Sequence, residues 1–223
     1  MTLRMLFQLL VLPLPWPLRR PLLGLIPGFT IARSARIGLS VIGADRAVLG
    51  EGAVVGHLTL VKGLSLLELG YNARLGNLNW VTAVRRGAGG SFAHLPDRTP
   101  SLVIADEGAV THRHLIDCTG GVSVGHHATV AGWHSQIISH SFDFRESRQD
   151  AAAIAIGAHA FVGSRAILLK GSALPERSIL GAGSVLDTRE TQPLGLYRGN
   201  PAMRVGELPA DLGYFLRESG FIE

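Results

Sequence analysis

The sequence predicts an all-β solenoid built from six-residue repeats. Because side chains on a strand alternate between two faces, a period of six keeps a repeated position on one face of an extended chain, whereas a helix would distribute it around its axis. Such a row of aliphatic residues occupies the C-terminal third: Ile156, Val162, Leu168, Leu174, Leu180 and Leu186. Small residues stand two positions before the last five: Ala160, Ala166, Ser172, Ser178 and Ser184. Short strands separated by tight corners at a fixed period are typical of a β-solenoid.

The repeat also predicts which residues stack on one another. If three six-residue sides make one turn, residues eighteen apart lie on adjacent coils at the strand spacing of about 4.8 Å. We therefore expect Ile156 to lie on Leu174. In the same way we expect Val162 to lie on Leu180, and Leu168 on Leu186.

The same period is found earlier in the chain, with changes of register. We expect the inward row to contain Ile31, Ile37, Ile42, Val48, Val54, Leu60 and Leu66, then Ile104, Val110, Ile116 and Val122, with Val124 and Val130 following in a shifted register. The repeats therefore predict one β-helix domain over residues 31–206.

Residues 1–30 differ from the rest of the chain. An apolar run from Leu3 to Leu18 contains Pro13, Pro15 and Pro17, and it is short for a membrane-spanning helix. We interpret the segment as a cap over the open end of the solenoid, hiding an edge that would otherwise pair with another chain. A second hypothesis is shallow docking of residues 1–20 on a membrane surface, with Arg19 and Arg20 meeting anionic head groups. A secretory signal is disfavoured because no small-residue cleavage site follows.

The other end of the chain predicts a short helix. Within residues 207–223, the spacing of Leu212, Phe215 and Leu216 is typical of an amphipathic helix between Pro209 and Ser219. We expect this helix to pack on the solenoid.

Composition favours a single intracellular domain. The chain has 223 residues, 28 glycines to serve corners, and one cysteine, Cys118, which we expect to be a buried apolar residue. One cysteine excludes an intramolecular disulfide and suits a reducing compartment, so we expect a cytoplasmic protein, in the second hypothesis peripheral to the inner face of the membrane. The net charge of +4 favours an anionic ligand, but the basic residues are dispersed and nucleic acid is not expected.

Two stretches interrupt the repeats, at residues 85–100 and 141–153. Insertions that leave a solenoid usually cluster where ligands bind. The second insertion begins directly after His140, which ends the apolar stretch Ser135–Ser139. A histidine there would be held by a rigid strand and covered by a loop.

Three motifs resemble those of the hexapeptide-repeat acyltransferases, which include maltose and galactoside acetyltransferases and the O-acetyltransferases of polysaccharide biosynthesis. The motifs are His140-Ser-Phe-Asp143, Ile156-Gly157-Ala-His-Ala-Phe161-Val162-Gly163, and Gly181-Ala182-Gly183-Ser184-Val185 followed by Gly199-Asn200-Pro201-Ala202. The resemblance implies a left-handed parallel β-helix, acetyl-CoA as co-substrate, and a homotrimer with active sites between subunits.

Histidine suits the implied chemistry, which needs a base to remove the proton of a weakly nucleophilic hydroxyl. Its unperturbed pKa of about 6.5 leaves it mostly neutral at neutral pH and able to accept that proton. We therefore predict that His140 is the general base. Asp143, His134 and Trp133 are candidates to bind the acceptor or orient the base. Asp143 has the alternative of being a plain loop carboxylate, and His134 that of packing.

The resemblance also implies residues for the donor. Small residues allow the pantetheine arm to approach the backbone, and arginines suit its phosphates. The candidate donor residues are Gly163, Ala182, Gly183, Ser184, Arg198, Asn200 and Arg204. For the two arginines, a solvated basic tail is the alternative.

We therefore predict an acetyltransferase that acts on a hydroxyl or amine of a sugar or glycan intermediate. One alternative is a noncatalytic trimeric scaffold. Another is a metal enzyme resembling γ-class carbonic anhydrases, for which His112 and His114 would supply two ligands. No metal is expected, because no third ligand is evident.

Overall fold

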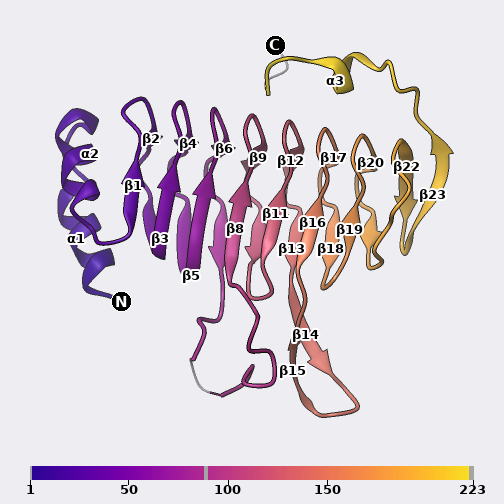
Figure 1. Ribbon diagram of the computed structural model, residues 1–223, viewed down its shortest axis with the longest axis horizontal. Helices are drawn as coiled ribbons and strands as arrows, with labels where there is room; N and C mark the ends of the chain where they lie inside the picture. Colours follow the sequence, from indigo (N-terminus) through magenta and orange to yellow (C-terminus); the bar gives the residue numbers. More distant parts are fainter. Residues whose placement is uncertain (1, 88–89, 221–223) are drawn as a thin grey trace.

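Each coil of the chain contributes one short strand to each of three sides of a solenoid (Figure 1). The computed structural model describes residues 2–87 and 90–220. We call the three sides I, II and III, in the order in which the chain passes through each coil. The coils are built almost entirely from parallel strands, as the six-residue period predicts.

Side I is one sheet whose final pair is antiparallel. Its strands are β2 (Arg36–Ile37), β4 (Val54–Val55), β6 (Arg74–Leu75), β9 (Ala109–His112), β12 (Thr129–Trp133), β17 (Phe161–Val162), β20 (Ile179–Leu180), β22 (Gly195–Gly199) and β23 (Ala202–Glu207).

Sides II and III form a second sheet that bends around a corner, because β3 (Val41–Leu49) and β5 (Leu60–Leu69) run through both. Side II continues with β7 (Trp80–Thr82), β10 (Leu115–Asp117), β13 (Gln136–Ile138), β18 (Ile167–Leu169) and β21 (Val185–Leu186). Side III has β1 (Phe29–Ile31), β8 (Ser101–Ile104), β11 (Val122–Val124), β16 (Ile154–Ile156) and β19 (Ala173–Leu174).

The predicted stacking is confirmed. Ile156 pairs with Leu174, Val162 with Leu180, and Leu168 with Leu186 in adjacent strands. All six side chains are buried, so each contributes about 1.5–3 kcal/mol through burial of apolar surface. The core is therefore a set of aliphatic columns running along the solenoid axis.

The corners are formed differently from the glycine-rich corners that composition suggests. The five small residues of the second repeat row are buried and fill the inside of each corner. The residue before each has a positive φ, and in three of the five it is not glycine: His159 (55°), Arg165 (58°) and Arg177 (49°). Left-handed backbone costs an L-residue about 1–2 kcal/mol, which the strand pairing on either side must offset.

The predicted inward row is wrong between residues 48 and 66. Val48, Val54, Leu60 and Leu66 are only half-buried, and the buried row runs one position later, through Leu49, Val55, Val61 and Leu67. The row slips by one position between Ile42 and Leu49, which are both buried but seven residues apart. The cause is a register shift between Gly43 and Ala44, where β3 passes the corner.

Two helices, α1 (Leu3–Val11) and α2 (Trp16–Gly24), cover the open end of the first coil (Figure 1). The Gln8 amide donates to the Ile42 carbonyl and accepts from the Ile42 N–H, both at 2.8 Å, as a neighbouring strand would. The buried Arg19 guanidinium donates to the carbonyl oxygens of Ile37 and Gly38. These contacts satisfy edge groups that the first coil would otherwise leave unpaired. Within the described residues, no helix has the length and apolarity needed to cross a membrane.

The last described residues, 208–220, form what we call the C-terminal segment, which runs back along the solenoid (Figure 1). The Tyr214 hydroxyl donates to the Ala160 carbonyl at 3.2 Å, and the Gly220 N–H donates to Glu107 at 2.8 Å. The predicted helix is shorter than expected: α3 (Gly213–Leu216) is a single turn, because Arg217 is already extended and donates to the His127 carbonyl.

Both insertions leave the solenoid at the corner between sides II and III. The first connects β7 to β8, and the second is a hairpin of β14 (His140–Asp143) and β15 (Arg148–Ala151) that connects β13 to β16. They project from the same edge of the solenoid (Figure 1). The fold therefore places the two insertions around one site.

Candidate active site

His140 is the first residue of the hairpin, and its imidazole lies against a buried carboxylate. Nδ1 of His140 is 2.7 Å from Oδ2 of Asp117, and the two side chains are 36% and 7% exposed. This is ion-pair distance, although the ring N–H does not point at the oxygen closely enough for a linear hydrogen bond. The Asp117 carboxylate raises the pKa of His140 above its usual value, and partial burial only partly opposes this.

Asp117 is held from several directions. It ends β10, one coil before His140, and accepts hydrogen bonds from the Thr119 hydroxyl at 2.6 Å and from the Ser139 N–H and hydroxyl, both at 3.1 Å. Burial acts to raise the pKa of Asp117, but the contacts with His140, Thr119 and Ser139 outweigh it and the pKa is lowered. The carboxylate is therefore a fixed negative charge behind the histidine.

The first insertion closes over the same corner through Arg98. This buried arginine donates to the carbonyl oxygens of Val84 at 2.6 Å and Thr119 at 2.8 Å, which ties the insertion to the coil that carries Asp117. Its guanidinium lies 4.4 Å from the centre of the Phe92 ring, and that ring meets His140 edge-on with the ring centres 6.4 Å apart. His140 is thus packed by the first insertion as well as by its own hairpin.

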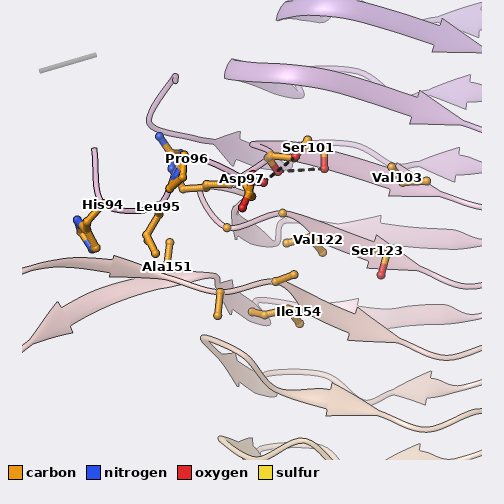
Figure 2. Close-up of a pocket in the computed structure, with 16 residues that line it drawn as sticks. His94, Leu95, Pro96, Asp97, Ser101, Val103, Val122, Ser123, Ala151 and Ile154 are labelled. Atoms are coloured by element: carbon orange, nitrogen blue, oxygen red, sulfur yellow. Dashed lines mark hydrogen bonds between the residues drawn. The ribbon is translucent and has the colours of Figure 1, made fainter. Parts of the chain in front are cut away.

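A cavity of about 530 Å³ lies between the first insertion and side III, at the corner that carries His140 (Figure 2). Neither His140 nor Asp117 lines it, but Arg98 does. Its lining includes His94 and Asp97 from the insertion, Ser123 from β11, and Ala151, the residue that faces His140 across the hairpin. Its lining is mixed, with hydroxyl, imidazole, carboxylate and guanidinium groups among apolar ones. This is the composition expected of a site for a polar small molecule.

The structure does not support Asp143 as the residue that orients the base. Its Oδ1 accepts hydrogen bonds from the N–H groups of Arg145 at 2.9 Å and Glu146 at 3.2 Å. Asp143 therefore stabilises the turn of the hairpin, which is the loop-carboxylate alternative, and the carboxylate beside His140 is Asp117.

Trp133 and His134 lie at the other end of β13, at the corner between sides I and II. Trp133 ends β12 with its ring about half-exposed and 5.4 Å from the Arg113 guanidinium, and His134 has a positive φ of 64°. Six residues separate His134 from His140, which corresponds to at most about 20 Å of extended chain. The structure thus places these two candidates at a different corner from His140.

The candidate donor residues lie at the same corner as Trp133. Gly163 follows β17, Ala182, Gly183 and Ser184 connect β20 to β21, and the Gly199 N–H donates to the Ser184 hydroxyl at 3.2 Å. We call this set the corner column. The coils approach closely here, because a Cβ on Gly163 would lie 2.6 Å from the Ala182 nitrogen, whereas nothing lies within 4 Å of one on Gly183.

The two candidate arginines and Asn200 continue the column toward the end of the solenoid. Arg198 is exposed and packs its aliphatic stem over Gly181, and Arg204 lies 3.7 Å from Glu207. Asn200 is exposed beside them.

The two histidines of the metal hypothesis, His112 and His114, each make hydrogen bonds within the solenoid. His114 is buried, with Nδ1 accepting from the Ser135 N–H at 3.2 Å and Nε2 3.0 Å from the Thr111 hydroxyl, and burial lowers its pKa to about 4. His112 accepts from the Asn77 N–H at 2.9 Å. Among residues 2–87 and 90–220, no group of three or more His, Cys, Asp or Glu side chains is arranged to hold a metal ion. Cys118 is fully buried, as expected, and burial raises the pKa of its thiol.

Sequence reasoning missed Asp117, Arg98 and Phe92. Asp117 carries a signal, because it directly follows the inward-facing Ile116 and precedes the buried Cys118. A carboxylate in such an apolar stretch needs a partner, but the partner lies across a coil boundary and cannot be identified from the local pattern.

Comparisons with known proteins find similar structures but no similar sequence family. No protein family and no curated protein matches the chain. The polysialic acid O-acetyltransferase OatWY aligns with a TM-score of 0.58 and 18% identity over 80% of this chain and 84% of its own. A hexapeptide-repeat acetyltransferase, VCA0836 from Vibrio cholerae, solved with acetyl coenzyme A, aligns with a TM-score of 0.50 and 18% identity over 64% and 71%. The chain therefore has the left-handed β-helix fold of the hexapeptide-repeat acetyltransferases, as predicted.

Proposed function

We propose that this β-helix is an acetyltransferase that moves an acetyl group from acetyl-CoA to a hydroxyl of a sugar or glycan intermediate. The observation that carries the proposal is the His140–Asp117 pair at the corner from which both insertions project. A cavity of about 530 Å³ opens at the same corner, lined by residues next to the pair such as Arg98 and Ala151. The acetyltransferase fold supports it, because one similar structure was solved with acetyl coenzyme A and another acts on polysialic acid.

In the proposed reaction His140 is the general base. Asp117 lies against Nδ1, which leaves Nε2 to accept the proton of the acceptor hydroxyl as its oxygen attacks the thioester carbonyl. A C–O bond forms, the C–S bond breaks, and the proton passes from His140 to the departing sulfur. Backbone N–H groups are the expected stabilisers of the oxyanion. No covalent enzyme intermediate is required.

Asp117 has two effects on this base. It holds the imidazole in place, and it raises the pKa of His140. A higher pKa makes the neutral imidazole a stronger base but reduces the fraction that is neutral at a given pH. The rate of acyl transfer should therefore rise with pH through the pKa of His140.

The donor is assigned to the corner column. The open surface at Gly183 would admit the pantetheine arm against the backbone, and the exposed Arg198 with Asn200 and Arg204 would meet the phosphates. We assign the acceptor to the cavity at the corner between sides II and III, which carries His140 and lies at the other end of β13 from the corner column.

This arrangement favours a homotrimer. Side II separates the corner column from His140 of the same chain. An acetyl-CoA molecule lying along the column would therefore not face His140 of its own subunit. Packing side II of one subunit near the column of another would bring the two halves together. Each active site would then lie between subunits, and Trp133 and His134 would contact the acceptor from the neighbouring subunit.

The test is calorimetric titration with acetyl-CoA, together with a screen for acceptors that release free CoA. His140→Ala should bind acetyl-CoA as the wild type does and lose roughly 10²- to 10⁴-fold in kcat. His57→Ala is the matched control and should retain activity, because this exposed histidine lies between β4 and β5, four coils nearer the cap than Gly163. Unchanged turnover in His140→Ala would refute the base, and no acetyl-CoA binding by the wild type would refute the transferase.

A further inference from the structure

The helical cap leaves an apolar groove open on its outer face. The exposed fractions of Leu3, Leu10 and Leu25 are 82%, 79% and 72%, although α1 and α2 bury Gln8, Val11, Arg19 and Leu23. With Phe7 and Ile26 they line a groove of about 680 Å³. Contiguous exposed leucines of this kind usually mark an interaction surface.

Charge is concentrated at the same end of the molecule. Residues 1–46 contain six arginines and one acidic residue, Asp45, a net charge of +5, whereas the whole chain has +4. The remaining residues therefore carry a net charge of −1. Arg33, Arg36 and Arg46 are exposed on the first coil, next to the cap. An apolar face with surrounding arginines is the composition of a surface that lies in the interface of an anionic membrane.

We propose that the cap docks on a bilayer containing anionic lipids, with Leu3, Leu10 and Leu25 entering the boundary between head groups and acyl chains. Each helix has nine residues, which is too short to span a bilayer and suited to lying on it. A second copy of the chain is disfavoured as the occupant of the groove, because end-to-end contact would bring two arginine-rich ends together.

Docking at the end of the solenoid sets a height for the active site. His140 follows β13, which is the fifth strand of side II after β3, β5, β7 and β10. Four coil spacings of about 4.8 Å and a helix layer of about 10 Å therefore separate His140 from the bilayer. The histidine would stand roughly 30 Å from the surface. A distance of roughly 30 Å suits a lipid-linked glycan of several sugars as the acceptor and not a lipid head group. This inference about the acceptor, unlike the docking itself, rests on the proposed function.

The experiment is co-sedimentation of the full chain with vesicles of phosphatidylcholine alone and of phosphatidylcholine with phosphatidylserine. The wild type should pellet with the anionic vesicles, and less at higher salt because screening weakens the arginine contacts. Leu10→Glu and Leu25→Glu should each lower the partition coefficient at least about tenfold. Leu216→Glu is the matched control and should behave as the wild type, because this leucine in α3 is also well exposed, at 60%, but lies away from the cap.

A variant with Arg33, Arg36 and Arg46 changed to glutamine separates the charge from the apolar surface. It should lose most of the preference for anionic vesicles and keep its thermal stability. The proposal is overturned if the wild type pellets with neither vesicle, if Leu10→Glu and Leu216→Glu pellet alike, or if Leu10→Glu instead changes the mass of the particle in solution. None of these readouts depends on acetyl transfer.

Discussion

Replacing Asp117 with asparagine tests the candidate base most directly. Asparagine has the shape of aspartate, so its amide oxygen can accept from the Ser139 N–H while its NH₂ group donates to the Thr119 hydroxyl, and the fold should be kept. What is lost is the negative charge 2.7 Å from Nδ1 of His140. A charge-assisted contact of this kind contributes about 1.5–3 kcal/mol, so kcat should fall roughly 10- to 150-fold.

The matched control is Asp143→Asn, because sequence reasoning offered Asp143 for the same role. Its carboxylate only stabilises the hairpin turn, so we expect a loss of less than about threefold, within the small range typical of exposed substitutions. The assay is release of free CoA from acetyl-CoA in the presence of an acceptor. Equal losses in the two variants, or a larger loss in Asp143→Asn, would refute the assignment of Asp117.

The pH dependence gives a second readout, and its NMR part does not need an acceptor. Titration of the His140 ring followed by NMR should show a lower pKa in Asp117→Asn than in the wild type, and the rising limb of kcat/KM should move to lower pH with it. Because the folded-state pKa of His140 is raised, its contribution to stability is complete below the unfolded value of 6.5. It is lost as the pH rises through the folded pKa. An unchanged His140 titration in Asp117→Asn would contradict the pairing itself.

Three other experiments test the fold. Because only Val55 faces the core, Val55→Ala should lower the free energy of unfolding by about 2–3 kcal/mol and Val54→Ala by less than about 1 kcal/mol, measured by guanidinium unfolding. Equal losses would contradict the observed inward row. The pKa of His114 is about 4 in the folded protein and near 6.5 in the unfolded chain, so the free energy of unfolding should fall by about 3 kcal/mol between pH 6.5 and pH 4. His114→Asn should lack this dependence on pH. Gly163→Ala should cost about 1–3 kcal/mol because its Cβ would meet the Ala182 nitrogen, whereas Gly213→Ala, with nothing within 4 Å, should change the melting temperature little.

The fold could be predicted because a six-residue period is readable in the side chains themselves. Ile156, Val162 and Leu168 stack where a coil of three sides places them. The inward row failed between Val48 and Leu66 because the length of a coil is set by how the strands pass a corner. In β3 and β5 the chain continues as strand around that corner, with a register shift at Gly43, and local periodicity carries no information about it.

The candidate site was predictable only in part. His140 stands out because it ends an apolar stretch and begins an insertion, and the structure places it beside a buried carboxylate. Asp117 was missed because their contact depends on the pairing of β10 with β13, which is a property of stacked coils. The turn role of Asp143 depends on the hairpin conformation, which no repeat specifies.

The C-terminal segment has a consequence for how the molecule unfolds. Coils of a solenoid contact only their neighbours, so such chains tend to melt piecemeal from an end. Here the C-terminal segment links three successive coils, because Gly220 bonds to Glu107, Arg217 to His127 and Tyr214 to Ala160. Opening any one of these coils requires releasing the C-terminal segment from all three. The middle of the protein should therefore behave as one cooperative block, with protection from amide hydrogen exchange nearly uniform across those coils.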